Sequence, residues 1–118
     1  MSNMLPSWVM RYVGVPFVEG GADISGADCY GLVSLVLEDQ TGAPLPRTVA
    51  DAAVFGWHPI PIGEVAAGDV LLFEHPGGLT HVGLMVTSQS YLETRPGKFS
   101  RIARLRHASG RISVWRRG

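Results

Sequence analysis

The stretch Asp28-Cys29-Tyr30-Gly31-Leu32-Val33 contains the only cysteine of the 118-residue chain. It follows a glycine-rich loop, Glu19 to Gly26, and begins an apolar run that predicts a helix over Cys29–Gln40 with Asp28 as its N-cap. A thiol in the first turn of a helix lies near the positive end of the helix dipole, which favours the nucleophilic thiolate. The stretch therefore predicts either a reactive cysteine or, as for most free cysteines, a small buried apolar side chain.

Length and composition predict one globular domain over residues 1–118, since 46% of the residues are hydrophobic and can bury a core without disulfides. A single cysteine forms no internal disulfide, so an oxidising compartment is not implied. The first eight residues lack the basic and apolar segments of a signal peptide, and no apolar run is long enough to cross a bilayer. We therefore expect a protein that is made in the cytoplasm and has no membrane span.

The basic residues gather near the C-terminal end, although the formal net charge is zero. Eight of the ten lie after residue 94: Arg95, Lys98, Arg101, Arg104, Arg106, Arg111, Arg116 and Arg117. This asymmetry indicates either a surface for an anionic polymer or solvated edge strands whose charges oppose aggregation, and we favour the edge strands. No aromatic-rich basic patch of the kind found on single-strand binding surfaces accompanies the cations, so we expect no nucleic-acid partner.

The remaining sequence predicts helices first and strands afterwards. A short helix is expected between Pro6 and Gly14, and an irregular connection over Pro44–Pro61 with a helical turn at Val49–Phe55 and a structural His58. Strands are expected at Val70–Phe73, His81–Thr87, Tyr91–Thr94, Phe99–Arg106 and Ile112–Arg116, with a loop carrying Pro76-Gly77-Gly78 before His81. This order predicts an α+β fold in which the helices pack on a central antiparallel sheet of about five strands.

His81 is the candidate base, because a cysteine nucleophile needs a base and the base needs an orienting partner. A three-residue turn centred on Thr87 would place Glu93 directly opposite His81, whereas a two-residue turn would move Glu93 to the other face. We expect the first register, in which Glu93 orients the ring and stabilises imidazolium. The alternatives are an exposed or otherwise satisfied histidine and a surface glutamate paired with Arg95 or another late arginine. The Cys29 backbone N–H would stabilise the oxyanion.

Four segments, in order, resemble motifs of the NlpC-type cell-wall peptidases, a papain-like cysteine peptidase family. Val15 to Gly21 resembles the segment before the nucleophile, and Asp28 to Val33 resembles the DCSGLV motif that carries it. Gly68 to Phe73 resembles the GDLVFF strand, and His81 to Leu84 resembles the HVGI strand that carries the base. The resemblance extends nearly from end to end and implies a nucleophile-bearing helix packed on an antiparallel sheet.

Further details resemble the phage-tail-associated branch of this family. They are the aromatic Tyr30 after the cysteine, the phrase Ala43-Pro44-Leu45-Pro46 and the closing segment Ile112 to Arg116. This branch implies a component of a phage or prophage tail that acts at the cell wall, with tail proteins as partners. The alternative is a non-catalytic or weakly active tail-tip or assembly module that keeps the fold.

The resemblance implies a catalytic set of Cys29, His81 and Glu93, and a substrate cleft that includes Phe17, Asp28, Tyr30 and Gly83. Cys29 would attack a carbonyl of a peptidoglycan stem peptide, typically between D-glutamate and the diamino acid, and His81 would protonate the leaving amine. No metal or organic cofactor is implied. The chain departs from the family at Glu93, where histidine is common, at Phe17, which replaces a tyrosine, and at Tyr30, which replaces a serine.

Two other chemistries involve the same residues. Acyl transfer or amidase chemistry could use the same dyad, as in related papain-like families. A metal site could be built from Cys29, His75 and His81, but only His75 and His81 are close in sequence, which argues against it.

Overall fold

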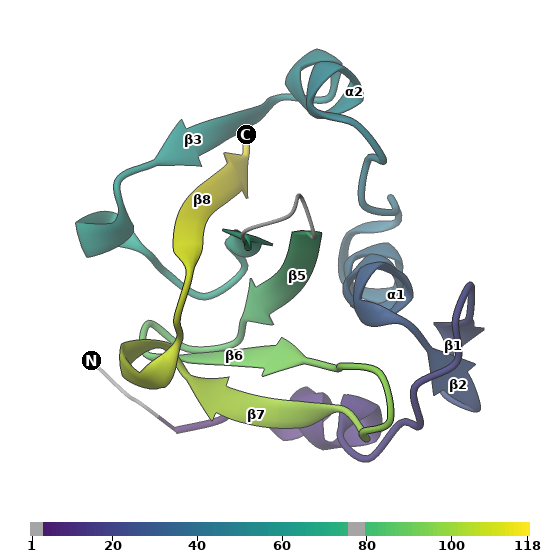
Figure 1. Cartoon of the computed structure of the whole chain (residues 1–118). Helices are drawn as coiled ribbons and strands as arrows, with labels where there is room; N and C mark the ends of the chain where they lie inside the picture. The colour runs from purple at the N-terminus through teal and green to yellow at the C-terminus, as the bar shows by residue number, and fades with distance from the viewer. Residues whose placement is uncertain (1–3, 76–79) are drawn as a thin grey trace.

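The structure, a computed structural model, describes residues 4–75 and 80–118. The loop expected at Pro76-Gly77-Gly78 lies outside the described residues. In chain order the elements are η1 Ser7–Tyr12, β1 Ala22–Asp23, β2 Gly26–Ala27, α1 Cys29–Thr41, α2 Val49–Val54, β3 Trp57–Ile60, η2 Ile62–Glu64, β4 Val70–Glu74, β5 Thr80–Met85, β6 Ser90–Glu93, β7 Arg101–Arg104, η3 Leu105–His107 and β8 Arg111–Arg117. Helices α1 and α2 lie on one side of a curved sheet (Figure 1).

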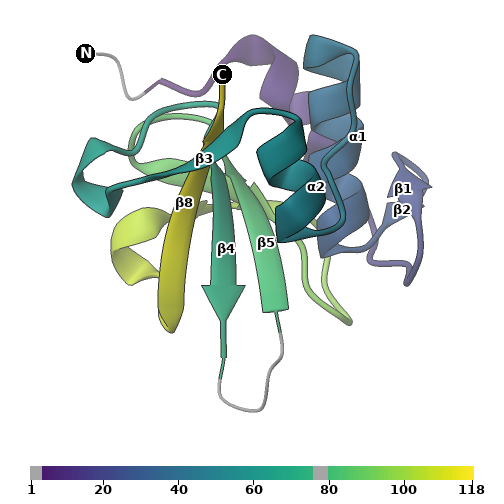
Figure 2. The same ribbon diagram turned by 90° about the horizontal axis from the view of Figure 1, so that it is seen from above.

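The main sheet has six antiparallel strands in the order β3-β8-β4-β5-β6-β7, and Figure 2 shows β8, β4 and β5 side by side. The prediction of an antiparallel sheet is confirmed, but the count of about five strands is wrong, because β3 adds a sixth strand and β1 and β2 form a separate small sheet. The sequence predicts an irregular connection over this segment, and β3 corrects that prediction. Pro59 is accommodated because β3 is an edge strand that pairs only with β8, so its missing N–H removes no bond within the sheet.

Helix α1 begins and ends where the sequence predicts, to within one residue. The Asp28 carboxylate Oδ1 accepts the N–H of Gly31 at 2.7 Å, which caps the first turn. Gly42 ends the helix with a φ of 82°, a left-handed conformation that glycine adopts without strain. The predictions of an N-cap at Asp28 and a helix stop at Gly42 are therefore confirmed.

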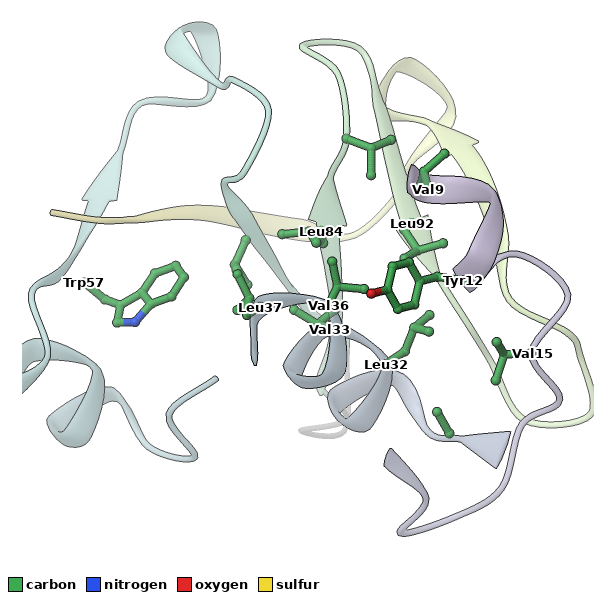
Figure 3. Packing of buried hydrophobic residues seen from close by; sticks show 13 residues of the cluster. Val9, Tyr12, Val15, Leu32, Val33, Val36, Leu37, Trp57, Leu84 and Leu92 are labelled. Atoms are coloured by element: carbon green, nitrogen blue, oxygen red, sulfur yellow. The ribbon is translucent and has the colours of Figure 1, made fainter. Parts of the chain in front are cut away.

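The buried face of α1 packs on the sheet and forms the larger core cluster. Leu32, Val33 and Val36 of α1 meet Leu84 of β5 and Leu92 of β6 (Figure 3). The predicted N-terminal helix is present as the 3₁₀ helix η1, which adds buried apolar side chains to the same cluster. Because this packing fixes α1 against β5 and β6, it also fixes where the first turn of the helix lies relative to these strands.

A second core cluster lies on the other face of the sheet. It consists of Leu71, Phe73, Met85, Tyr91 and Val114. Strand β5 is therefore buried on both faces, with alternate side chains directed to the two clusters. His81, at the start of β5, shares the face of Met85 and so lies beside the second cluster.

The strands are shorter than predicted at two turns. Strand β5 ends at Met85, because the Thr87 hydroxyl accepts the N–H groups of Gln89 and Ser90 at 3.1 and 3.0 Å and thereby begins the turn. Strand β7 ends at Arg104, where the chain enters η3 instead of continuing to Arg106. Within residues 4–75 and 80–118, no helix has the length and hydropathy needed to cross a membrane.

Candidate active site

The start of α1 is held tightly against the preceding loop. Besides capping the helix, the Asp28 carboxylate accepts the N–H of Gly20 at 2.9 Å through Oδ2. A Cβ atom on Gly31 would lie 1.9 Å from the backbone oxygen of Gly21, so only glycine fits here. These contacts place Cys29, which is partly buried, at a fixed position in the first turn of the helix.

Cys29 and His81 are brought together although they are far apart in sequence. Burial raises the pKa of the Cys29 thiol, but a hydrogen bond with the His81 side chain and one from the Val82 backbone outweigh it, so the net pKa is lowered. Burial lowers the pKa of His81, but hydrogen bonds with Cys29 and Glu93 outweigh it, so the net pKa is raised. The two shifts favour a thiolate paired with an imidazolium, the reactive form of a Cys–His pair.

Glu93 is the third member of this chain of contacts. Its side chain is fully buried, and its Oε1 accepts a hydrogen bond from His81 Nε2 at 2.8 Å. Its Oε2 accepts two hydrogen bonds from Arg101, from Nε at 3.0 Å and from Nη2 at 2.9 Å. Arg95 Nη2 lies 3.2 Å from Oε1. Burial raises the pKa of Glu93, but the His81 and Arg101 hydrogen bonds outweigh it and lower the pKa to about 2.

The contacts of Glu93 combine those expected under both sequence-based alternatives, and its catalytic role stays a prediction. The carboxylate binds His81, as the catalytic hypothesis expects, and it pairs with late arginines, as the alternative expects. The alternative is wrong only in placing this glutamate at the surface.

The strand register differs from the predicted one. Leu84 pairs with Leu92 and Met85 with Tyr91, so the turn is centred on residue 88 and not on Thr87. This register places Glu93 diagonally from His81 and not directly opposite. A slip of one residue would have moved Glu93 to the other face, but the difference between the observed and expected pairing is two residues, which keeps both side chains on the same face.

Aromatic rings support the imidazole from the second core cluster. Phe73 is the direct partner of His81 across β4 and β5, and their ring centroids are 5.2 Å apart. The Tyr91 ring lies 5.5 Å from Phe73 and also covers Gly83, where a Cβ atom would lie 2.9 Å from Tyr91 Cδ2. The structure thus gives Gly83 a packing role, and its predicted contact with substrate stays a prediction.

The sequence reasoning assigned no role in the site to Phe73 or Arg101. Arg101 is the direct partner of Glu93 across β6 and β7. Opposite charges eight residues apart, on two consecutive strands, could have indicated this pair, but only with the correct register. Phe73 lies within the predicted strand, and its role follows only from its pairing with His81.

A cavity of about 180 Å³ is lined by the sequence neighbours Tyr30, Thr80 and Val82, but not by Cys29, His81 or Glu93 themselves. Its walls include Tyr30, Arg47 and Leu45 on the helical side, and Val82, Trp57 and Trp115 on the sheet. The Arg47 guanidinium lies 4.7 Å from the centre of the Tyr30 ring, and the Tyr30 hydroxyl donates to the Leu45 carbonyl. Most of the cavity surface is apolar, and Arg47 contributes a cation to its wall.

The predicted substrate residues are distributed unevenly around this cavity. Of the four, Tyr30 lines it, whereas Phe17, Asp28 and Gly83 are not among the described residues that do. Phe17 lies beside the start of the helix through its bridge to Ala27, and Asp28 acts as the cap. The connection over Pro44–Pro61 supplies part of the wall through Leu45, Arg47 and Trp57.

A metal site is not formed by the residues considered for one. Across the described ranges, no group of three or more His, Cys, Asp or Glu side chains could hold a metal ion. Cys29, His75 and His81 therefore do not gather around a common point.

Comparisons with known proteins find related sequences and a related fold. A sequence model for the NlpC/P60 family matches residues 14–114. A protein of Mycobacterium tuberculosis named a probable endopeptidase is 39% identical over 86 residues, which are 70% of this chain and 22% of that protein. The gamma-DL-glutamyl hydrolase of Bacillus subtilis is 33% identical over 86 residues, 70% of this chain and 21% of that protein. The chain thus spans about a fifth of the length of these two relatives.

One solved structure resembles nearly the whole chain. It is the NlpC/p60 domain of the peptidoglycan hydrolase SagA, with a TM-score of 0.72 and 29% sequence identity. The match covers 90% of this chain and 91% of that one.

Proposed function

Because this chain belongs to the NlpC/P60 family, we propose that it is a cysteine peptidase that hydrolyses stem peptides of peptidoglycan. The observation that carries the proposal is the His81–Glu93 hydrogen bond at 2.8 Å, together with a Cys29 thiol whose pKa is lowered, against the effect of burial, by its interaction with His81. A solved relative that matches this chain over 91% of its own length is a domain of a protein named a peptidoglycan hydrolase.

The proposed reaction uses only side chains and backbone of this chain. The Cys29 thiolate attacks the peptide carbonyl, and the Cys29 backbone N–H at the start of α1 stabilises the oxyanion. His81 gives its proton to the leaving amine, and a thioester remains. Water then attacks the thioester while His81 takes up a proton, and cleavage of the C–S bond releases the carboxylate product and restores the Cys29 thiolate. Because Nε2 of His81 is held by Glu93, the other ring nitrogen is the one that serves Cys29.

The scissile bond that we propose joins D-glutamate to the diamino acid. A γ-linked glutamyl residue keeps its α-carboxylate free, and Arg47 at the cavity beside Tyr30 offers a cation to such a group. The relative named gamma-DL-glutamyl hydrolase supports the choice of a glutamyl bond.

We further propose that the protein works in a phage or prophage tail, is made in the cytoplasm and acts at the cell wall. Tyr30 and the segment Ala43–Pro46 support a role in a phage tail, because both resemble the phage-tail branch of the family. A non-catalytic tail module is the competing function, and Phe17 favours it, because the tyrosine hydroxyl found beside the nucleophile in the family is missing here.

Mass-resolved digestion of defined muropeptides tests the proposal. We expect the wild-type protein to release new stem-peptide ends, and we expect Cys29→Ala and His81→Ala to release none. His58→Ala is the matched control, since His58 is exposed on β3 away from the site. Release of the sugar-linked amide instead would indicate an amidase, and no release by the folded wild-type protein would favour the non-catalytic module.

A further inference from the structure

We propose that Arg101 is a positioning residue of this site: it fixes the Glu93 carboxylate so that one oxygen is reserved for His81. The inference rests on the proposed cysteine chemistry, because positioning matters only if His81 activates Cys29. It concerns the feature in which this chain departs from the family pattern, a glutamate where histidine is common.

Arg101 and His81 bind different oxygens of the Glu93 carboxylate. Two N–H donors of Arg101 converge on Oε2 at 3.0 and 2.9 Å, and Oε1 is left for His81 at 2.8 Å. Glu93 and Arg101 are direct partners across β6 and β7, so the strand pairing presents the guanidinium to the carboxylate. The Arg101 side chain is 65% exposed, whereas Glu93 is fully buried.

Arg95 has a different effect on the same carboxylate. Its Nη2 lies 3.2 Å from Oε1, the oxygen that binds His81, so Arg95 competes with the imidazole for that oxygen. Its positive charge also opposes protonation of His81. The charged or titratable groups that act on Glu93 are thus His81 from β5, Arg101 from β7, Arg95 after β6 and Tyr91 within β6.

The terminal torsion of a glutamate has a broad energy profile, so a carboxylate with one strong partner can rotate. Without Arg101, both oxygens of Glu93 are open to Arg95, and a rotated carboxylate would leave His81 without its acceptor. The imidazolium would then be less stable, and the Cys29 thiolate would lose its counter-charge. Arg101 therefore acts on Cys29 through two intermediates, Glu93 and His81.

Alkylation of Cys29 by iodoacetamide as a function of pH tests this proposal without any peptide substrate. Because Cys29 is the only cysteine, the measured rate belongs to this thiol alone. For Arg101→Gln we expect a midpoint about one pH unit higher, and therefore alkylation about tenfold slower at pH values well below the wild-type midpoint, since one unit is a factor of ten. Arg104→Gln, an exposed arginine on the same strand, should match the wild type.

Two further variants separate positioning from folding. Arg101→Lys keeps the charge without two fixed donors, so we expect a wild-type melting temperature and slow alkylation. Arg101→Gln combined with Arg95→Gln removes the competitor for Oε1, so we expect part of the lost rate to return. If Arg101→Gln does not fold, Arg101→Lys decides the question.

The outcomes distinguish this inference from the proposed function. A low alkylation midpoint in the wild type, with unchanged profiles in folded Arg101→Gln and Arg101→Lys, overturns the positioning role alone. An ordinary thiol profile in the wild type overturns both. An equal shift in Arg104→Gln would reduce the effect to general surface charge and would also overturn the positioning role.

Discussion

Phe73 and His81 are direct partners across strands β4 and β5, and their ring centroids are 5.2 Å apart. The Phe73 side chain is fully buried, and its ring also contacts Tyr91. The imidazole therefore has a rigid aromatic wall on one side and the Glu93 carboxylate at its Nε2. Two independent contacts thus limit the rotation of a ring that must present its other nitrogen to Cys29.

We expect Phe73→Leu to lower kcat about tenfold, because the imidazole gains freedom and spends less time facing Cys29. The free energy of unfolding should fall by about 1 kcal/mol, as for a buried hydrophobic substitution that loses some volume. Hydrolysis kinetics and urea unfolding measure the two effects. Phe99→Leu is the control, since Phe99 is 65% exposed, and an equal loss of activity in both variants would contradict the role of the wall.

Gly31 provides a second prediction, on the stability of the helix start. A Cβ at this position would collide with the backbone oxygen of Gly21, which a side-chain movement cannot relieve. We expect Gly31→Ala to destabilise the protein by about 1–3 kcal/mol or more and to slow Cys29 alkylation, because the loop and helix must separate. In Gly63→Ala the added Cβ meets nothing within 4 Å, so that variant should retain both properties.

The fold was predictable to the extent that local chemistry determines it. The Asp28 cap, the apolar spacing of α1 and the Gly42 stop are local signals, and the helix follows them. Strand β3 was missed because Pro59 argues against a strand unless its edge position is known. The β5–β6 register was missed because the Thr87 side chain, and not the backbone alone, begins the turn.

The candidate site was predictable in its members more than in its geometry. Cys29, His81 and Glu93 could be named because nucleophile, base and orienting group have characteristic residue types. Arg101 and Phe73 reach the site only through strand pairing, Arg101 with Glu93 and Phe73 with His81. Such contacts between strands depend on register, which a single sequence specifies weakly.

Arg47 provides the third prediction, on substrate recognition. Its guanidinium lies over the Tyr30 ring at the cavity, where we propose that it binds the glutamyl α-carboxylate. We expect Arg47→Gln to raise KM about tenfold with little change in kcat, because a remote charge contact is lost from ground state and transition state alike. Steady-state kinetics on a defined stem peptide measure this, with Arg106→Gln, exposed on η3, as control. A fall in kcat at constant KM would contradict the assignment.

The last prediction concerns acid stability and Glu93. Its pKa is about 2 in the folded protein against an ordinary 4.5, a difference that corresponds to at most about 3 kcal/mol, reduced by the solvent around Arg101. A lowered pKa stabilises the folded state above pH 4.5, and this contribution is lost as the pH falls from 4.5 toward 2.

Wild type and Glu93→Gln should therefore differ most in melting temperature near neutral pH, and the difference should narrow below pH 4.5. The raised pKa of His81 contributes in the opposite sense, since its stabilisation is complete below its unfolded value of 6.5 and is lost as the pH rises through the folded value. The change in melting temperature below pH 4.5 therefore reports the titration of Glu93 and not that of His81. Glu74→Gln replaces an exposed glutamate at the end of β4 and should show no such narrowing. If the difference in melting temperature between wild type and Glu93→Gln stayed constant across pH, the neighbours of Glu93 would not be lowering its pKa.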